Sequence, residues 1–342
     1  MVRNIIVIIV AVLTIFQSIF SIFHVKKGRS LISNIRRIAC REEIALHAQR
    51  LSSETQYLET LSQFYSFLGV SDQSSYVSNI LKLSVSSAVK IIKEKGSLIE
   101  ISFPESRKSD ISVVETLEIN KDFAFQFASS LANNKVAIDD PSDIWLIFPD
   151  KKEGILALKN KDQSKILFSV TSIDTLAKQQ QQSLPPVLAN KVLIFVNPGF
   201  NVEEWLAMAK IYEKAPSAIV IAINGNLDRL RNNYYPPFFY PALAAATKSF
   251  FARFSPALFL SPVAVNGDRL GAWICTASSS PASSTGAEAA GSPPWVLLVR
   301  SPKSATSSRS YSVASIFDSE PQPNVLWKEA KQAHFDTWGK RF

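Results

Sequence analysis

Cysteine, histidine and glycine are scarce in this chain of 342 residues, which contains 2 Cys, 3 His and 11 Gly. Cys40, His24 and His47 lie in the first 50 residues, so only Cys275 and His334 remain in the rest of the chain. Two cysteines exclude a disulfide framework. One Cys and one His far apart in sequence supply neither an activated thiol pair nor the ligand set of a zinc site. We therefore expect no metal site.

The glycine-rich phosphate-binding motifs are also absent. Neither G-x-x-x-x-G-K-[ST] nor G-x-G-x-x-G occurs, so we predict no bound cofactor. After residue 50, carboxylates adjacent in sequence occur at Asp139-Asp140 and Glu203-Glu204, and adjacent residues do not face each other on a helix. The sequence thus leans against an enzyme, although a site built from Asp, Arg and Asn would leave no such motif.

Positive charge is concentrated at the start of the chain. Residues 1–50 hold eight Lys and Arg residues and two acids, a net charge of +6. Because the whole chain carries +8, residues 51–342 carry only +2. The near-neutral remainder lacks the basic groove that nucleic-acid binding requires, so we expect no nucleic-acid partner.

The first 50 residues resemble a targeting sequence. An apolar run from Ile5 continues to Phe23 after a short basic start, and both a cleaved secretory signal and a retained membrane anchor fit it. Residues 24–50 are rich in Arg, Lys and Ser, like a transit peptide. Together the two parts predict entry into a plastid through the secretory pathway. The alternative is a protein of the secretory pathway, or one anchored in a membrane only through residues 5–23.

Short apolar runs separated by helical segments follow the leader. The apolar runs are 98–103, 144–148, 166–170, 192–196 and 218–223, and helices are expected at 51–70, 75–95, 121–132, after Asn201, and at 242–254. Strands without polar alternation are buried on both faces, which predicts a Rossmann-like α/β domain with a mainly parallel sheet. Residues 258–260, 271–275 and 295–300 indicate a late antiparallel hairpin, and 324–342 a last helix. We expect one domain over 51–342, with a polar loop at 179–186 and a disordered insertion at 276–294.

Turn residues follow several of these strands and are candidate ligand-binding positions. They are Asp150, Asn197, Gly199, Asn224, Gly225 and, nearby, Arg229. In open α/β sheets, ligands bind outside the carboxyl ends of the strands, where helix N-termini can hold an anion. The alternative is structural, because Asn, Pro and Gly are the residues that sharp turns require and Asp150 can simply cap a helix.

The segment Tyr234-Tyr235-Pro236-Pro237-Phe238-Phe239-Tyr240 contains five aromatic residues in seven positions. Its prolines exclude a regular helix. Exposed aromatic residues are enriched where proteins bind partners, so Tyr234, Tyr235, Phe238, Phe239 and Tyr240 form a candidate partner-binding surface. The alternative is a lid that packs on the open end of the sheet.

The order of these segments resembles a known family. The sequence reads LIEISFPES at 98–106, DIWLIFPD at 143–150, VNPG at 196–199 followed by VEEW, AIVIAING at 218–225, and then the aromatic segment and late strands around Trp273 and Trp295. Over roughly 80–340 the chain is similar to the DUF1995 family, a plastid and cyanobacterial family of unknown function. The resemblance implies a Rossmann-like domain in a plastid and no established reaction; plant members include factors for photosystem II accumulation.

These observations lead to three functional hypotheses. The first is a non-catalytic binding or assembly factor for an organelle protein complex. The second is an enzyme or sensor that binds a nucleotide-like or phosphorylated ligand at the strand-end turns. The third is a scaffold anchored in a membrane by residues 5–23.

Overall fold

The computed structural model describes most of the chain after residue 72. The described residues are 73–104, 112–135, 137–159, 161, 166–181, 188–199, 201–232, 234–265, 268–277, 295–300, 311–317 and 319–338. All of them fall in one compact unit, Thr60–Phe342. The expected signal or anchor, the basic leader, the helix at 51–70 and nearly all of the insertion at 276–294 lie outside the described residues.

A nine-stranded sheet forms the centre of the described part, in the order β3-β2-β4-β5-β1-β6-β7-β8-β9. The strands are β1 (Leu98–Ser102), β2 (Ile144–Phe148), β3 (Ser169–Ser172), β4 (Val192–Val196), β5 (Ile219–Ile223), β6 (Ser255–Val265), β7 (Asp268–Thr276), β8 (Trp295–Arg300) and β9 (Tyr311–Phe317). β1 to β6 pair in parallel and β6 to β9 pair antiparallel. The sequence prediction of an α/β fold with a mainly parallel sheet and a late antiparallel part is confirmed.

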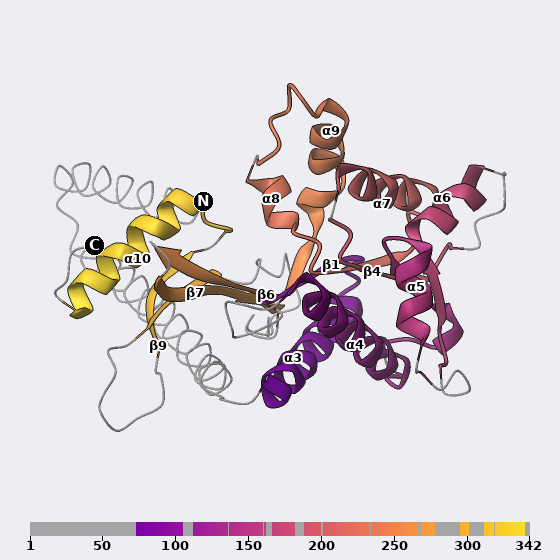
Figure 1. Cartoon of the computed structure of the whole chain (residues 1–342), viewed down its shortest axis with the longest axis horizontal. Helices are drawn as coiled ribbons and strands as arrows, with labels where there is room; N and C mark the ends of the chain where they lie inside the picture. The colour runs from indigo at the N-terminus through magenta and orange to yellow at the C-terminus, as the bar shows by residue number, and fades with distance from the viewer. Residues whose placement is uncertain are drawn as a thin grey trace, which may run out of the picture. The chain divides into compact units, whose positions relative to one another are not determined.

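Helices cover both faces of the parallel half (Figure 1). They are α3 (Gln73–Lys93), α4 (Val113–Ala132), α5 (Lys151–Leu158), α6 (Ile173–Gln181), α7 (Val202–Lys214), α8 (Leu227–Arg231) and α9 (Pro241–Ser249). α3 and α4 lie on one face, where Phe123 of α4 packs against Phe103 at the end of β1. α6 to α9 bury the opposite face around Trp205 and Phe195. This burial on both faces explains why all five residues of β4 are apolar and inaccessible.

The antiparallel half has a separate apolar cluster. Phe259, Trp273 and Trp295 pack with ring centroids 4.7–5.2 Å apart. Helix α10 (Pro323–Trp338) covers them with Leu326 and Ala330. Among the described residues, no helix is both long and apolar enough to cross a membrane.

Several predicted elements match the structure closely, and others were wrong at their ends. β2, β4 and β8 have the predicted bounds. β3 covers 169–172 rather than 166–170, and α9 ends at Ser249 rather than continuing to 254. α6 continues to Gln181, so the first three residues of the expected polar loop at 179–186 are helical, and the others lie outside the described residues. The sequence prediction missed β9 entirely.

Local hydrogen bonds explain two of the wrong boundaries. α4 begins at Val113, eight residues before the predicted start, because Ser112 and Glu115 form a capping box that holds the first turn. α3 ends at Lys93 rather than at 95. Lys95 is left-handed, with φ of 62°, and Gly96 donates its N–H to the Ile91 carbonyl at 2.9 Å, which completes the helix end.

Candidate functional site

The carboxyl ends of β4, β5 and β1 meet at one point of the sheet edge. There the structure brings together the predicted Asn197 and Asn224 and joins them through Asn120 of α4. Asn120 donates from Nδ2 to Asn197 Oδ1 at 3.0 Å, and Asn224 donates from Nδ2 to Asn120 Oδ1 at 2.8 Å. Asn224 Oδ1 accepts a hydrogen bond from the backbone N–H of Phe103 at 2.8 Å. We call Asn120, Asn197 and Asn224 the asparagine triad.

The asparagine triad is buried and fixes the backbone of two turns. Asn197 and Asn224 are each 7 % exposed, and Asn120 is fully buried. Both turn residues have left-handed backbones, with φ of 48° and 49°, a conformation that Asn tolerates better than most residues. Asn120 was missed by sequence reasoning. Its signal is a polar residue on the buried face of a helix, which requires a hydrogen-bond partner.

The two glycines of these turns permit close packing. A Cβ on Gly199 would lie 2.8 Å from the Gly225 carbonyl oxygen and 2.9 Å from Trp205 Cζ2. Trp205 donates its indole N–H to that same carbonyl at 2.9 Å. Gly199 is therefore required by the contact between the two turns and the buried tryptophan.

The helix N-terminus beside the triad is capped by the chain itself. The Asn201 side chain accepts from the Glu204 N–H at 3.0 Å and donates to the Glu204 carboxylate at 2.7 Å. A ligand anion at this helix start would have to compete with Asn201 and with the adjacent acid. The contacts at this edge thus favour the structural alternative of the sequence analysis, in which Asn and Gly shape the turns.

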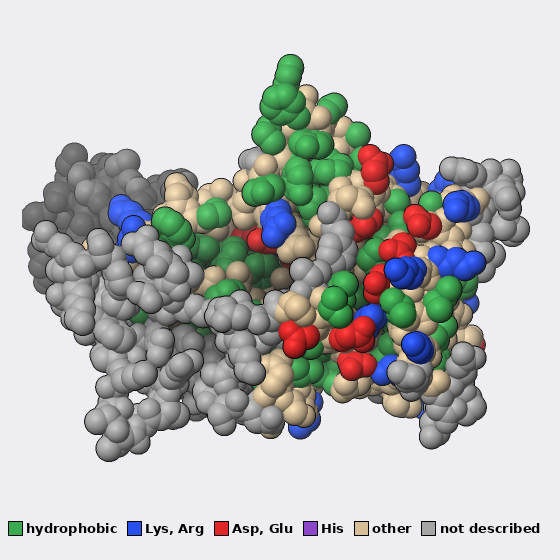
Figure 2. Space-filling model, in the orientation of Figure 1, with side chains coloured by type: hydrophobic (Ala, Val, Ile, Leu, Met, Phe, Trp, Pro, Cys, Tyr) green, Lys and Arg blue, Asp and Glu red, His purple; other side chains and the backbone are tan. Residues whose placement is uncertain are grey.

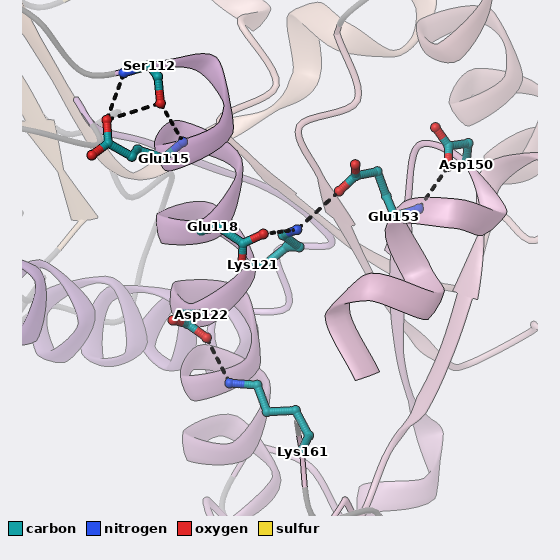
Figure 3. A network of polar contacts seen from close by, with 8 residues as sticks. All are labelled: Ser112, Glu115, Glu118, Lys121, Asp122, Asp150, Glu153 and Lys161. Atoms are coloured by element: carbon teal, nitrogen blue, oxygen red, sulfur yellow. Dashed lines mark hydrogen bonds and ion pairs between the residues drawn. The ribbon is translucent and has the colours of Figure 1, made fainter. Parts of the chain in front are cut away.

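Asp150 and Arg229 have partners outside the triad, and the Arg229 guanidinium lies over the ring of Tyr234, 5.8 Å from its centre. Asp150 caps α5 by accepting from the Glu153 N–H at 2.8 Å (Figure 3). Beside it, Lys121 of α4 bonds Glu118 at 2.6 Å and lies 3.5 Å from the Glu153 carboxylate. Burial would lower the pKa of Lys121, but these two acids outweigh it and raise the pKa. Figure 3 thus shows a chain of intramolecular pairs along α4 and α5.

The predicted aromatic segment is anchored at one residue. Tyr235 is half-buried against the core of α7 and α9. Its ring meets Trp205, Tyr234 and Tyr240 edge to face, with centroids 5.1–5.4 Å apart. The backbone turns tightly, because Phe239 and Tyr240 both donate their N–H to the Pro236 carbonyl, at 3.0 and 3.2 Å.

The rest of the segment faces outward. Phe238 is 88 % exposed, Phe239 71 %, Tyr234 67 % and Tyr240 39 %. Residues 236–242 are all exposed, and we call residues 234–242 the aromatic projection. Figure 2 shows it as hydrophobic side chains over the connection between α8 and α9, at the top of the view, with no charged side chain at the tip. The expected alternative of a lid packed on the sheet describes Tyr235 but not the two phenylalanines.

A buried ion triad that sequence reasoning missed links the two halves of the sheet. Glu100, in the middle of β1, is 1 % exposed, and its Oε2 lies 2.8 Å from Nη1 of Arg231 at the end of α8. Arg231 also bonds Glu320, which precedes α10. The contact with Glu100 is not aligned as a hydrogen bond, so both Glu100 oxygens are buried without a hydrogen-bond partner among the described residues.

Burial dominates the ionisation of the two acids of this triad. It raises the pKa of Glu100, against the lowering effect of Arg231, and raises the pKa of Glu320 to about 7. Burial also raises the pKa of the Cys275 thiol well above its ordinary value, so this cysteine is a poor nucleophile. Neither motif spacing nor periodicity identifies the ion triad, since its members come from a strand, a short helix and a loop.

The described residues contain no group of three or more His, Cys, Asp or Glu side chains that could hold a metal ion.

A family model described as a domain of unknown function, DUF1995, matches residues 79–327. No curated protein and no solved structure matches the chain. Because the match covers most of the sequence, the chain belongs to the DUF1995 family.

Proposed function

We propose that this member of the DUF1995 family is a non-catalytic binding protein that assists the assembly of a plastid protein complex, and that the aromatic projection is the surface that engages its target. The family description carries no activity, so the proposal rests on the described side chains and on the leader sequence.

The observation that carries the proposal is the exposure of two adjacent phenylalanines at the end of an anchored segment. Phe238 and Phe239 expose 88 % and 71 % of their surface. Their rings lie edge to face at 5.3 Å. Isolated exposed apolar residues are normal on a protein surface, but a contiguous apolar patch marks an interaction site. Aromatic side chains on a rigid support are typical of such sites.

The strand-end turns support the proposal by contrast. A ligand-binding enzyme or sensor would use Asn197 and Asn224, the second hypothesis of the sequence analysis. Their side chains instead bond Asn120 and the Phe103 backbone. The arrangement favours a sheet edge closed by its own residues over one open to a phosphorylated ligand.

The plastid location is supported by the leader alone. The apolar run at 5–23 and the basic stretch at 24–50 have the composition of a signal followed by a transit peptide. A secretory or membrane-anchored location is the competing possibility for the same residues. The protein can be tagged at its C-terminus in the native cell. Microscopy then shows where it is located, and the length of the mature protein shows whether the leader is removed.

The binding proposal is tested by affinity capture of the tagged chain from its native cell. The pair Phe238→Ser and Phe239→Ser is compared with a matched pair elsewhere, Ile155→Ser and Leu167→Ser, which are 59 % and 54 % exposed. We expect the first pair to lose a reproducible set of partners and the second pair to keep it. Equal capture by both variants would overturn the proposal.

A further inference from the structure

Resting on the proposed function, we infer that the immediate target of the aromatic projection is the interfacial region of an anionic lipid bilayer. The projection would then hold the protein on the membrane surface that carries the complex it helps to assemble. Three features of the described residues lead to this inference: the side chains of the tip, the charges around it and the hydrogen bonds of its backbone.

The tip is apolar throughout. Residues 236–242 read Pro-Pro-Phe-Phe-Tyr-Pro-Ala and are all exposed. No charged residue occurs between Arg231 and Lys248. Its two phenylalanines are 88 % and 71 % exposed, and their side chains carry no polar group that hydrocarbon would leave without a hydrogen bond. Tyr234 and Tyr240, at the base of the tip, are the amphipathic residues that concentrate at the membrane–water boundary.

The charges on the chain segment that carries the projection have one sign. Between Asp228 and Asp268 the chain contains no acid. Three exposed basic residues lie in that interval: Arg229, Lys248 and Arg253. Arg229 lies over the ring of Tyr234 at the base of the tip, 5.8 Å from its centre. An apolar tip on a segment whose charges are all basic matches the combination of hydrocarbon and anionic headgroups at a bilayer surface.

The backbone of the projection suits a medium that offers no hydrogen bonds. Pro236, Pro237 and Pro241 have no N–H group. Phe239 and Tyr240 donate theirs to the Pro236 carbonyl within the turn. Because an unsatisfied N–H is costly in hydrocarbon, a segment with few free donors can be inserted more readily than an ordinary loop. Tyr235, packed edge to face against Trp205 and Tyr240, holds this shape, so insertion requires little ordering of the chain.

The test places an environment-sensitive fluorophore at residue 238 of the full chain. Phe238→Cys is made in a Cys40→Ser background and labelled; Cys275 is buried and does not compete. The control label is at Lys152→Cys, an exposed position on α5. Vesicles contain brominated lipids in either phosphatidylcholine alone or equal parts phosphatidylcholine and phosphatidylglycerol. Labels at defined positions separate insertion of the projection from membrane binding by residues 5–23.

We expect bromine quenching at position 238 in the anionic vesicles, weaker quenching in the neutral ones, and none at position 152. Adding Phe239→Ser should lower the inserted fraction about tenfold, the loss expected for removing one large apolar side chain from hydrocarbon. A label at 238 that stays in water with both vesicles overturns the inference. In that case, shielding of the same label by solubilised organelle proteins would keep the proposed function and make its target a protein. No shielding, together with cell capture that Phe238→Ser and Phe239→Ser leave unaffected, would overturn the proposed function as well as the inference.

Discussion

The asparagine triad and the aromatic projection are both unusual in residue type, and the structure gives them opposite environments. The triad is polar and buried, and each of its side chains bonds another described residue. The projection is apolar and exposed, and only Tyr235 is packed into the core. A buried polar group whose hydrogen bonds are made inside the protein serves the fold, whereas an exposed apolar group has no such role. This contrast supports a structural role for the strand-end turns and the proposal that the projection binds a target.

The largest expected effect comes from the ion triad, which is internal like the asparagine triad but poorly satisfied. Arg231→Met should lower the free energy of unfolding by about 3–5 kcal/mol, because it leaves Glu100 as an uncompensated buried carboxylate. Denaturant titration measures the change. Arg229→Met, an exposed neighbour, should change the free energy by less than about 0.5 kcal/mol. Similar values for the two variants would show that the ion pair does not matter to the fold.

Removing the centre of the asparagine triad should cost somewhat less. Asn120→Ala leaves Asn197 Oδ1 and Asn224 Nδ2 without their shared partner, so we expect a loss of roughly 2–4 kcal/mol in unfolding free energy. The matched control is Asn201→Ala, which removes an exposed helix cap and should cost about 1 kcal/mol. An Asn120→Ala variant with an unchanged unfolding free energy would contradict this structural role and make the asparagine triad a candidate ligand-binding site again.

The pH dependence of stability sharpens the account of the ion triad. The pKa of Glu320 is about 7 in the folded protein against an ordinary 4.5. The folded protein therefore binds this proton more tightly than the unfolded chain, and stability falls as pH rises from about 4.5 to 7. The linkage amounts to about 3 kcal/mol. Glu320→Gln should remove that part of the decrease. Thermal melts of the original protein and of Glu320→Gln between about pH 4.5 and pH 7 test this prediction. The same dependence of melting temperature on pH in both proteins would refute the role of Glu320.

The smallest expected effect is on the stability of the projection variant. Phe238→Ser with Phe239→Ser should change the unfolding free energy by less than about 0.5 kcal/mol, since these side chains are mostly in water. Tyr235→Ser should cost more, because it removes the ring that packs edge to face against Trp205. Calorimetry of the two variants tests whether the projection is anchored at Tyr235 alone. A large loss for the serine pair would mean that the phenylalanines serve the fold.

The parts of the fold that could be predicted from sequence are those with local causes. β2, β4 and β8 were located because an uninterrupted apolar run needs no tertiary information to be recognised as a buried strand. β9 has an alternating pattern, Tyr-Ser-Val-Ala-Ser-Ile-Phe, which was not distinguished from the loops around it. The first two turns of α4 depend on a capping box at Ser112 that was not recognised.

The candidate sites divide in the same way. Asn197 and Asn224 were found because turn chemistry follows strand ends, but their shared partner Asn120 lies 77 residues from one and 104 from the other. The ion triad is assembled from Glu100, Arg231 and Glu320, which no local pattern connects. The aromatic projection was visible as a cluster in the sequence, yet only its exposure separates a lid from a binding surface.

The most direct test of the central claim is photocrosslinking from residue 238 in the native cell. A benzophenone amino acid replaces Phe238 in one strain and the exposed Ile155 of α5 in another. The account predicts reproducible adducts with lipid or with a defined protein from position 238 and none of these from position 155. Indistinguishable adduct patterns from the two positions, with the protein correctly folded in both strains, would contradict the claim that the aromatic projection is the working surface.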